Sequence, residues 1–205
     1  MRLFVAIDPP ETAQDHLAAA IAELAVVRSG VRVTARALWH VTLAFLGDLP
    51  DDRLDAAVKA LDEGVAGQSP PVLRIAGGGR FGRGKFTVLW AGIEGDLQPL
   101  RRSVTRELKR ARLPYDAKRF HPHLTIARPG DRVPVDGDAE ALKSYEGPQW
   151  TVEEVRVVRS YLGPKPRYET LHTAVVTRPM PPGPVPRSQP AGKVRRAGPA
   201  SDRPA

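Results

Sequence analysis

Along residues 1–177 the spacing of apolar residues switches repeatedly between a period of two and a period of about 3.6. A period of two lines one face of a strand, and a period of 3.6 lines one stripe of a helix. A chain that shows both predicts a mixed α+β fold. Some predicted strands follow one another with no helix between them, so a purely parallel sheet is not expected.

The predicted elements follow from these patterns. Residues 3–7 form a buried strand, after which Asp8 is predicted to cap a helix and Pro9 to occupy its first turn. The predicted inner faces of three helices are Ala13, Leu17, Ala20, Ile21 and Leu24, then Leu54, Ala57, Val58 and Leu61, then Leu97, Leu100, Val104 and Leu108. Further strands are predicted at 36–47, 72–79, 85–93, 121–128, 151–161 and 168–177.

A His-x-Thr motif occurs twice, each time inside a predicted strand. The first begins at His40 and the second at His123, which are 83 positions apart. That separation is roughly half of residues 1–177. We therefore predict one domain over 1–177, built from two related lobes that each contribute one motif strand to a common cleft.

Side chains alternate between the faces of a strand, so His40 and Thr42 are predicted to point the same way. Val41, Leu43 and Phe45 are then predicted to point the other way and to anchor the strand in a core. The motif side chains project from a rigid apolar base.

The second motif strand repeats this arrangement with His123 and Thr125 on one face and Leu124 and Ile126 on the other. Regular alternation places Arg128 on the face opposite His123. A role for Arg128 at a phosphate therefore requires a bend, which the following Pro-Gly pair allows.

Two histidines and two threonines that face one another suit acid–base chemistry at a phosphate. Histidine has an ordinary pKa of about 6.5 and exchanges protons near neutral pH. His40 and His123 are the predicted catalytic pair, and Thr42 and Thr125 the predicted phosphate-binding pair. One histidine alone in a strand is more often structural, and the occurrence of both motifs favours catalysis.

A metal site is the alternative reading of His121-Pro122-His123. No further cluster of histidines or acidic residues supplies the remaining ligands, so no metal is predicted. Pro122 removes an amide donor, which places this end of the strand at a sheet edge.

The glycine-rich segment 77–85 lacks the spacing of a phosphate-binding P-loop, and we interpret it as a hairpin turn. Its Arg80 and Phe81 are candidate RNA-binding residues, the first at the border of an RNA groove and the second for base stacking. Arg83 and Lys85 are candidates for the same border of the groove as Arg80.

Charge and composition distinguish residues 178–205 from the rest of the chain. The formal net charge is +8, of which residues 1–177 carry only +3. Residues 178–205 are rich in proline and basic side chains and hold no aromatic residue, so we predict a disordered tail. The chain contains no cysteine and no apolar stretch long enough for a signal peptide or a membrane span, and a cytoplasmic protein is expected.

Several segments resemble the 2H phosphoesterases, and most closely the bacterial and archaeal RNA 2′,3′-cyclic phosphodiesterases, also called 2′-5′ RNA ligases. They are residues 2–8, 40–47, 88–92, 122–128 and 160–162, together with Tyr168. The resemblance covers residues 1–177 and leaves the tail outside.

This resemblance implies a bilobal fold in which two antiparallel sheets, each backed by helices on its outer face, flank a central cleft. It implies hydrolysis of RNA 2′,3′-cyclic phosphate ends to 2′-phosphomonoesters without a cofactor. His40 is then the proton donor and His123 the proton acceptor, with Thr42, Thr125 and Arg128 at the phosphate. RNA is the expected partner of a monomeric protein, with no membrane.

Two alternatives stay open at this point. The same chemistry suits small cyclic phosphates of nucleosides or ADP-ribose. A cleft of this kind also suits an RNA-end-binding module without turnover.

Overall fold

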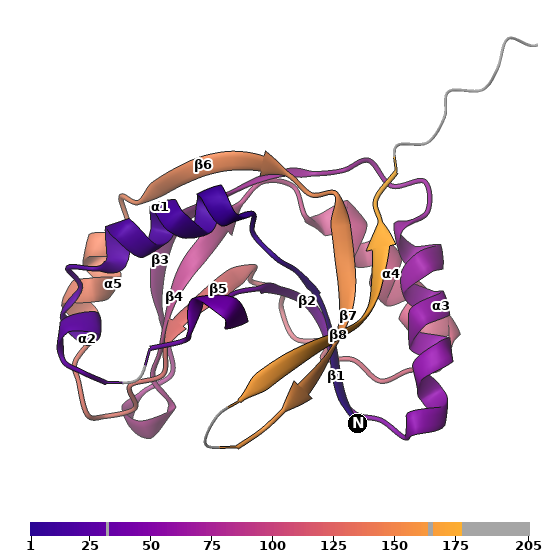
Figure 1. Cartoon of the computed structure of the whole chain (residues 1–205), viewed down its shortest axis with the longest axis horizontal. Helices are drawn as coiled ribbons and strands as arrows, with labels where there is room; N and C mark the ends of the chain where they lie inside the picture. The colour runs from indigo at the N-terminus through magenta and orange to yellow at the C-terminus, as the bar shows by residue number, and fades with distance from the viewer. Residues whose placement is uncertain (32, 164–165, 178–205) are drawn as a thin grey trace, which may run out of the picture.

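The computed structural model describes residues 1–31, 33–163 and 166–177, and the tail predicted at 178–205 lies outside these ranges. Eight strands form two four-stranded antiparallel sheets, and helices cover one face of each (Figure 1). The predicted α+β class, with two antiparallel sheets around a cleft, is confirmed.

Sheet A combines strands from both ends of the chain. Its order is β2-β1-β7-β8, with β1 (Arg2–Ile7), β2 (Val41–Asp48), β7 (Glu154–Tyr161) and β8 (Arg167–Val175). Its strands thus come from both the N-terminal and the C-terminal parts of the chain, so the two sheets are not the two halves of the sequence.

Sheet B is built from the middle of the chain. Its order is β5-β4-β3-β6, with β3 (Val72–Phe81), β4 (Val88–Glu94), β5 (His123–Ala127) and β6 (Glu146–Thr151). The strand that begins at His123 is an edge strand, as the preceding proline predicts.

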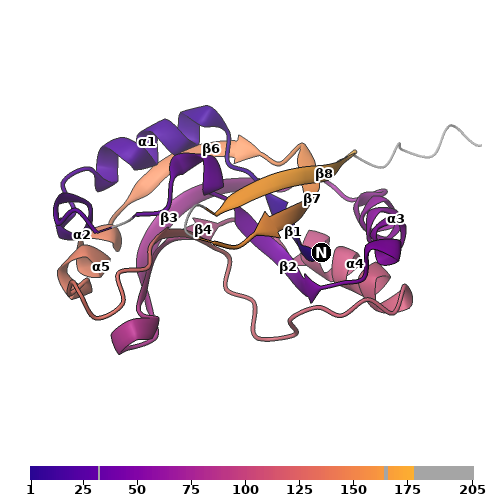
Figure 2. The same ribbon diagram turned by 60° about the horizontal axis from the view of Figure 1, so that its bottom comes forward.

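The helices are divided between the sheets irrespective of chain order. α3 (Leu54–Val65) and α4 (Gln98–Arg110) cover sheet A, whereas α1 (Glu11–Ile21) and α5 (Asp136–Leu142) cover sheet B (Figures 1 and 2). The shorter elements are α2 (Ala25–Arg28), η1 (Arg36–Leu38), η2 (Asp51–Arg53) and η3 (Gly84–Phe86). Among the described residues, no helix has the length and apolar character required to cross a lipid bilayer.

Two apolar cores lie between the sheets and their helices. One joins Leu3, Val5 and Ile7 of β1 to the inner faces of α3 and α4. These two helices cross closely at Gly64, where an added Cβ would lie 2.7 Å from the Val104 Cα. The other core joins α1 and α5 to sheet B through Leu17 and other buried side chains.

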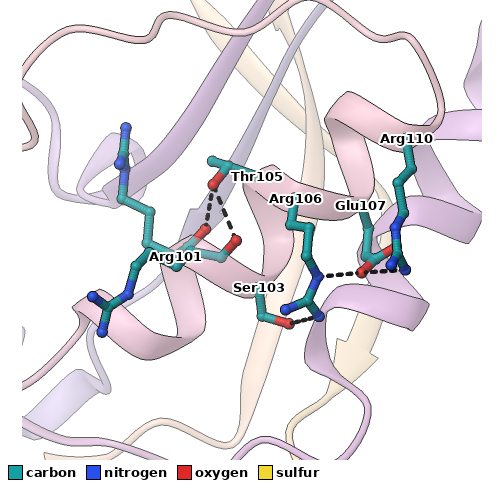
Figure 3. A network of polar contacts seen from close by, with 7 residues as sticks. Arg101, Ser103, Thr105, Arg106, Glu107 and Arg110 are labelled. Atoms are coloured by element: carbon teal, nitrogen blue, oxygen red, sulfur yellow. Dashed lines mark hydrogen bonds and ion pairs between the residues drawn. The ribbon is translucent and has the colours of Figure 1, made fainter.

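The polar face of α4 is organised around Glu107, whose side chain is only 3% exposed. Arg106 and Arg110 contact its carboxylate at 2.8 and 3.0 Å, and Arg106 also donates to the Ser103 hydroxyl (Figure 3). Hydrogen bonding from Arg106 lowers the pKa of the Glu107 carboxyl. The carboxylate is therefore held in its charged form against the helix.

Some sequence predictions are wrong in detail. Asp8 does not cap α1, which begins at Glu11, and pairs instead with Arg156. Ala20 is exposed and does not lie on the inner face of α1. The predicted strand at 36–47 begins only at Val41, after η1, and the one at 85–93 begins at Val88, after η3. Strand β6 and helices α2 and α5 were not predicted.

Candidate active site

A cleft of about 730 Å³ lies between the two sheets. Its lining includes His40 and Thr42 from the β2 side and His123 and Thr125 from β5, together with Arg128. Both motif strands are edge strands, β2 of sheet A and β5 of sheet B. The fold therefore brings together the five residues that were predicted for catalysis and phosphate binding.

Strand β2 does not alternate regularly beyond Thr42. The pairing with β1 shifts register around Leu43, so that Leu43 and Ala44 both point into the core. Phe45 consequently faces the cleft, and its predicted place in the core is wrong. Arg101 of α4, labelled in Figure 3, donates from Nε to the Leu43 carbonyl at 3.3 Å and so satisfies the backbone at this bulge.

Strand β5 contains a bulge at the equivalent position. The pairing with β4 shifts around Ile126, and both Ile126 and Ala127 are fully buried. Arg128 therefore returns to the face that carries His123 and Thr125 and lines the cleft. The bend that a phosphate role for Arg128 required is this bulge within the strand.

Both histidine rings are held by the same backbone contact. The Nδ1 of His40 lies 2.8 Å from the Leu38 carbonyl, and the Nδ1 of His123 lies 2.8 Å from the His121 carbonyl. A carbonyl only accepts hydrogen bonds, so each Nδ1 carries the proton. Each Nε2 is then the ring nitrogen that is able to take up or release a proton.

The surroundings disfavour the charged form of both rings. Burial lowers the pKa of His40, although the hydrogen bond to Leu38 and the charge of Asp8 oppose the shift. Burial likewise lowers the pKa of His123. The positive charge of Arg128 acts in the same direction on both, and an anionic ligand between them would reverse this effect.

Aromatic rings support the two histidines from different sheets. His40 packs against Phe4, with ring centroids 4.7 Å apart, and edge-to-face against Tyr168 at 5.2 Å. Phe81 packs edge-to-face against His123 at 5.0 Å and stacks on Trp90 at 4.9 Å. The rings of each cluster hold one imidazole.

The supporting residues had no catalytic signal in the sequence. Trp90 lies over Gly79, where an added Cβ would approach the indole to 2.7 Å. Arg132 also lines the cleft, and its Nε donates to the Pro129 carbonyl. Of the supporting residues, Phe4, Trp90 and Tyr168 belong to segments that resemble the phosphodiesterases, whereas Phe81 and Arg132 do not.

Arg80 and Phe81 occupy different environments. Arg80 forms an ion pair with Asp136 at 2.6 Å and donates to the Gly82 carbonyl. It lines a separate pocket of about 240 Å³ and not the cleft. Phe81 touches His123 and is covered on one face by Trp90.

No group of three or more histidine, cysteine, aspartate or glutamate side chains is arranged to hold a metal ion within the described part of the chain. His121 packs its ring against Trp90 at 4.6 Å and contributes its carbonyl to His123.

Sequence comparison relates this chain to phosphodiesterases. Residues 4–164 match the model of the 2′-5′ RNA ligase superfamily. A protein of Archaeoglobus fulgidus named RNA 2′,3′-cyclic phosphodiesterase is 34% identical over 176 residues, which are 83% of this chain and 98% of that protein. A protein of the same name from Thermus thermophilus is 34% identical over 83% of this chain and 88% of its own length. For one from Geobacillus stearothermophilus the match spans 44% of that protein and 65% of this chain, at 34% identity.

Solved structures show the same fold. TT0787 of Thermus thermophilus superimposes with a TM-score of 0.69 at 28% identity, over 86% of this chain and 98% of that one. LigT of E. coli, in its complex with NADP⁺, gives a TM-score of 0.66 at 25% identity with the same coverage.

Proposed function

Because the chain belongs to the 2′-5′ RNA ligase superfamily, we propose that it hydrolyses RNA 2′,3′-cyclic phosphate ends to 2′-phosphomonoesters, acting as a monomer in RNA processing. The observation that carries the proposal is the pair of histidines in one cleft, each with Nδ1 bound to a carbonyl and Nε2 left for proton exchange. The similarity to proteins named RNA 2′,3′-cyclic phosphodiesterase supports this choice of substrate.

In the proposed reaction a water oxygen attacks phosphorus while the Nε2 of His123 takes its proton. The bond from phosphorus to the 3′ oxygen breaks, and the Nε2 of His40 donates a proton to that oxygen. The phosphate stays on the 2′ oxygen. His40 ends neutral and His123 protonated, and exchange with solvent restores the starting state.

The phosphate is proposed to bind between Thr42, Thr125 and Arg128, which line the same cleft as the histidines. Two hydroxyl donors and one guanidinium suit the non-bridging oxygens, on which negative charge builds in the transition state. The bound phosphate also raises the histidine pKa values that burial has lowered, which favours the protonated His40 that the reaction needs.

The proposed reaction is independent of metal. In the proposed reaction His123 activates the water and Arg128 stabilises the negative charge. A metal ion would otherwise serve these two functions. The lack of a ligand cluster within the described ranges supports this choice.

The test is hydrolysis of an oligoribonucleotide with a 2′,3′-cyclic phosphate, with the position of the product phosphate identified. His40→Ala and His123→Ala are each expected to lower kcat by about 10²–10⁴ while the protein stays folded, since both rings act in proton transfer. His16→Ala is a matched control, because His16 lies exposed on α1 and bonds to the Tyr145 hydroxyl. A 3′-phosphate product, or near-normal kcat in either cleft variant, would contradict the proposal.

A further inference from the structure

The turn between β3 and β4 carries an exposed aromatic ring. Phe86 of η3 is 70% exposed, and the Lys85 ammonium lies 5.2 Å from its ring centre. Arg83 and Lys85 are also exposed, and neither forms an ion pair within the described residues. The turn lies at the end of the molecule opposite α3 and α4 in both views (Figures 1 and 2).

This turn is continuous with the cleft through the loop that follows β5. Arg128 and Arg132 of that loop line the cleft, whereas Gly130 and Asp131 between them line the pocket of about 240 Å³. Arg83 of the turn also lines this pocket. The loop and the turn touch, since an added Cβ at Gly130 would lie 3.6 Å from the Lys85 Cα.

The charge of this region suits a polyanion. Residues 80–87 contain three basic and no acidic side chains, and residues 128–136 contain two of each, so the net charge is +3. Arg80 and Asp136 neutralise each other in an ion pair. The positive charge that remains is concentrated at the turn and at the edge of the cleft.

We propose that Arg83, Lys85, Phe86 and Arg132, here called the upstream surface, bind the single-stranded RNA that precedes the cyclic phosphate. This inference rests on the proposed function. A 2′,3′-cyclic phosphate closes the 3′ end of an RNA, so every other nucleotide leaves the cleft on the 5′ side of the terminal ribose. Arg132 and Lys85 meet its phosphates, and a base stacks on Phe86.

Phe86 suits stacking better than Phe81. The Phe81 ring is already stacked on Trp90 at 4.9 Å and packs against His123. The Phe86 ring is mostly exposed, and a cation next to it attracts the RNA backbone.

The test compares a hexanucleotide that ends in a 2′,3′-cyclic phosphate with 2′,3′-cyclic AMP, which has no nucleotide on the 5′ side of its ribose. Phe86→Ala is expected to lower kcat/KM for the hexanucleotide roughly 5- to 150-fold, the loss of one base–aromatic stack. The value for 2′,3′-cyclic AMP stays at the wild-type level. Lys85→Ala is expected to reduce the slope of log affinity for the hexanucleotide against log salt by about 0.7, the loss of one phosphate contact.

The controls remove matched side chains far from the turn. Val175→Ala shortens an apolar side chain that is 58% exposed at the end of β8, and Lys109→Ala removes an exposed cation from α4. Both variants are expected to keep the wild-type kcat/KM for the two substrates.

The inference is overturned if Phe86→Ala leaves kcat/KM for the hexanucleotide unchanged, or if it lowers kcat/KM equally for both substrates. It is also overturned if Phe86→Ala changes the oligomeric state, which would identify a protein interface. A wild-type enzyme inactive on both substrates would overturn the proposed function, and the inference with it. Wild-type activity on both, with no selective loss in the variants, overturns the inference alone.

Discussion

Replacing Gly79 by alanine tests whether the aromatic cluster of sheet B positions His123. An added Cβ at Gly79 would lie 2.7 Å from Cζ2 of Trp90, 3.2 Å from Cη2 and 3.3 Å from Cε2. The indole Nε1 is buried and has no hydrogen-bond partner among the described residues, so packing alone fixes the ring. The added methyl group therefore displaces the indole.

The size of the effect follows from these contacts. Ordinary carbon contacts lie near 3.5–4.0 Å, so the indole moves by about 1 Å. The displaced indole pushes against the His121 ring, 4.6 Å away, and against Phe81, which packs on His123. Overpacking of this kind costs about 1–3 kcal/mol, or roughly 2–12 °C in melting temperature for a chain of this length. A displacement of about 1 Å at His123 lowers kcat/KM about 100-fold.

The assay is kcat/KM on the cyclic-phosphate RNA together with thermal unfolding. Gly137→Ala is the matched control, since an added Cβ there meets nothing within 4 Å and alanine favours helix α5. In a Trp90→Phe background, which removes the two closest indole atoms, Gly79→Ala is expected to cost less than in the wild type. Unchanged activity and melting temperature in the Gly79→Ala single variant would refute the positioning role of the cluster.

Three further predictions concern conditions. Because burial lowers the pKa of both His40 and His123, the bell-shaped pH profile of kcat/KM is expected to have its optimum below about pH 6.5. A flat profile or an alkaline optimum would contradict the paired-histidine scheme. Because these pKa values are lowered in the folded protein, His40 and His123 take up protons at a higher pH in the unfolded chain than in the folded one. The free energy of unfolding, measured by denaturant titration, is therefore expected to fall as the pH drops below about 6.5 toward the pKa values of the folded protein. A chelator is expected to leave activity unchanged, and loss that one divalent ion restores would disprove metal independence.

The sequence predicts elements well where one apolar face recurs. The strand at 3–7 and the stripe of α4 are confirmed, because burial of those faces forms the core. The stripe of α3 is confirmed except at Val58, which lies outside both cores. Strand β6 escaped prediction since it is a mostly exposed edge strand with a proline and no apolar alternation. The helices α2 and α5 are too short for a stripe to repeat.

The site was predictable as far as the alternation of side chains holds. His40, Thr42, His123 and Thr125 precede the bulges, and the cleft contains all four. Phe45 follows a bulge and faces the cleft against expectation. A bulge depends on the register with the partner strand, which lies far away in sequence, so the pattern within one strand does not reveal it.

The position of β1 inside sheet A affects how the protein is made. Residues 2–7 are translated well before their neighbour β7, which is made only from residue 154 onward. At about 5–20 residues per second this wait lasts roughly 7–30 s, during which one edge of β1 has no partner. Sheet B likewise gains β6 only from residue 146. A nascent chain stopped before residue 154 therefore already contains both histidines, while the sheet that supports His40 still lacks half of its strands.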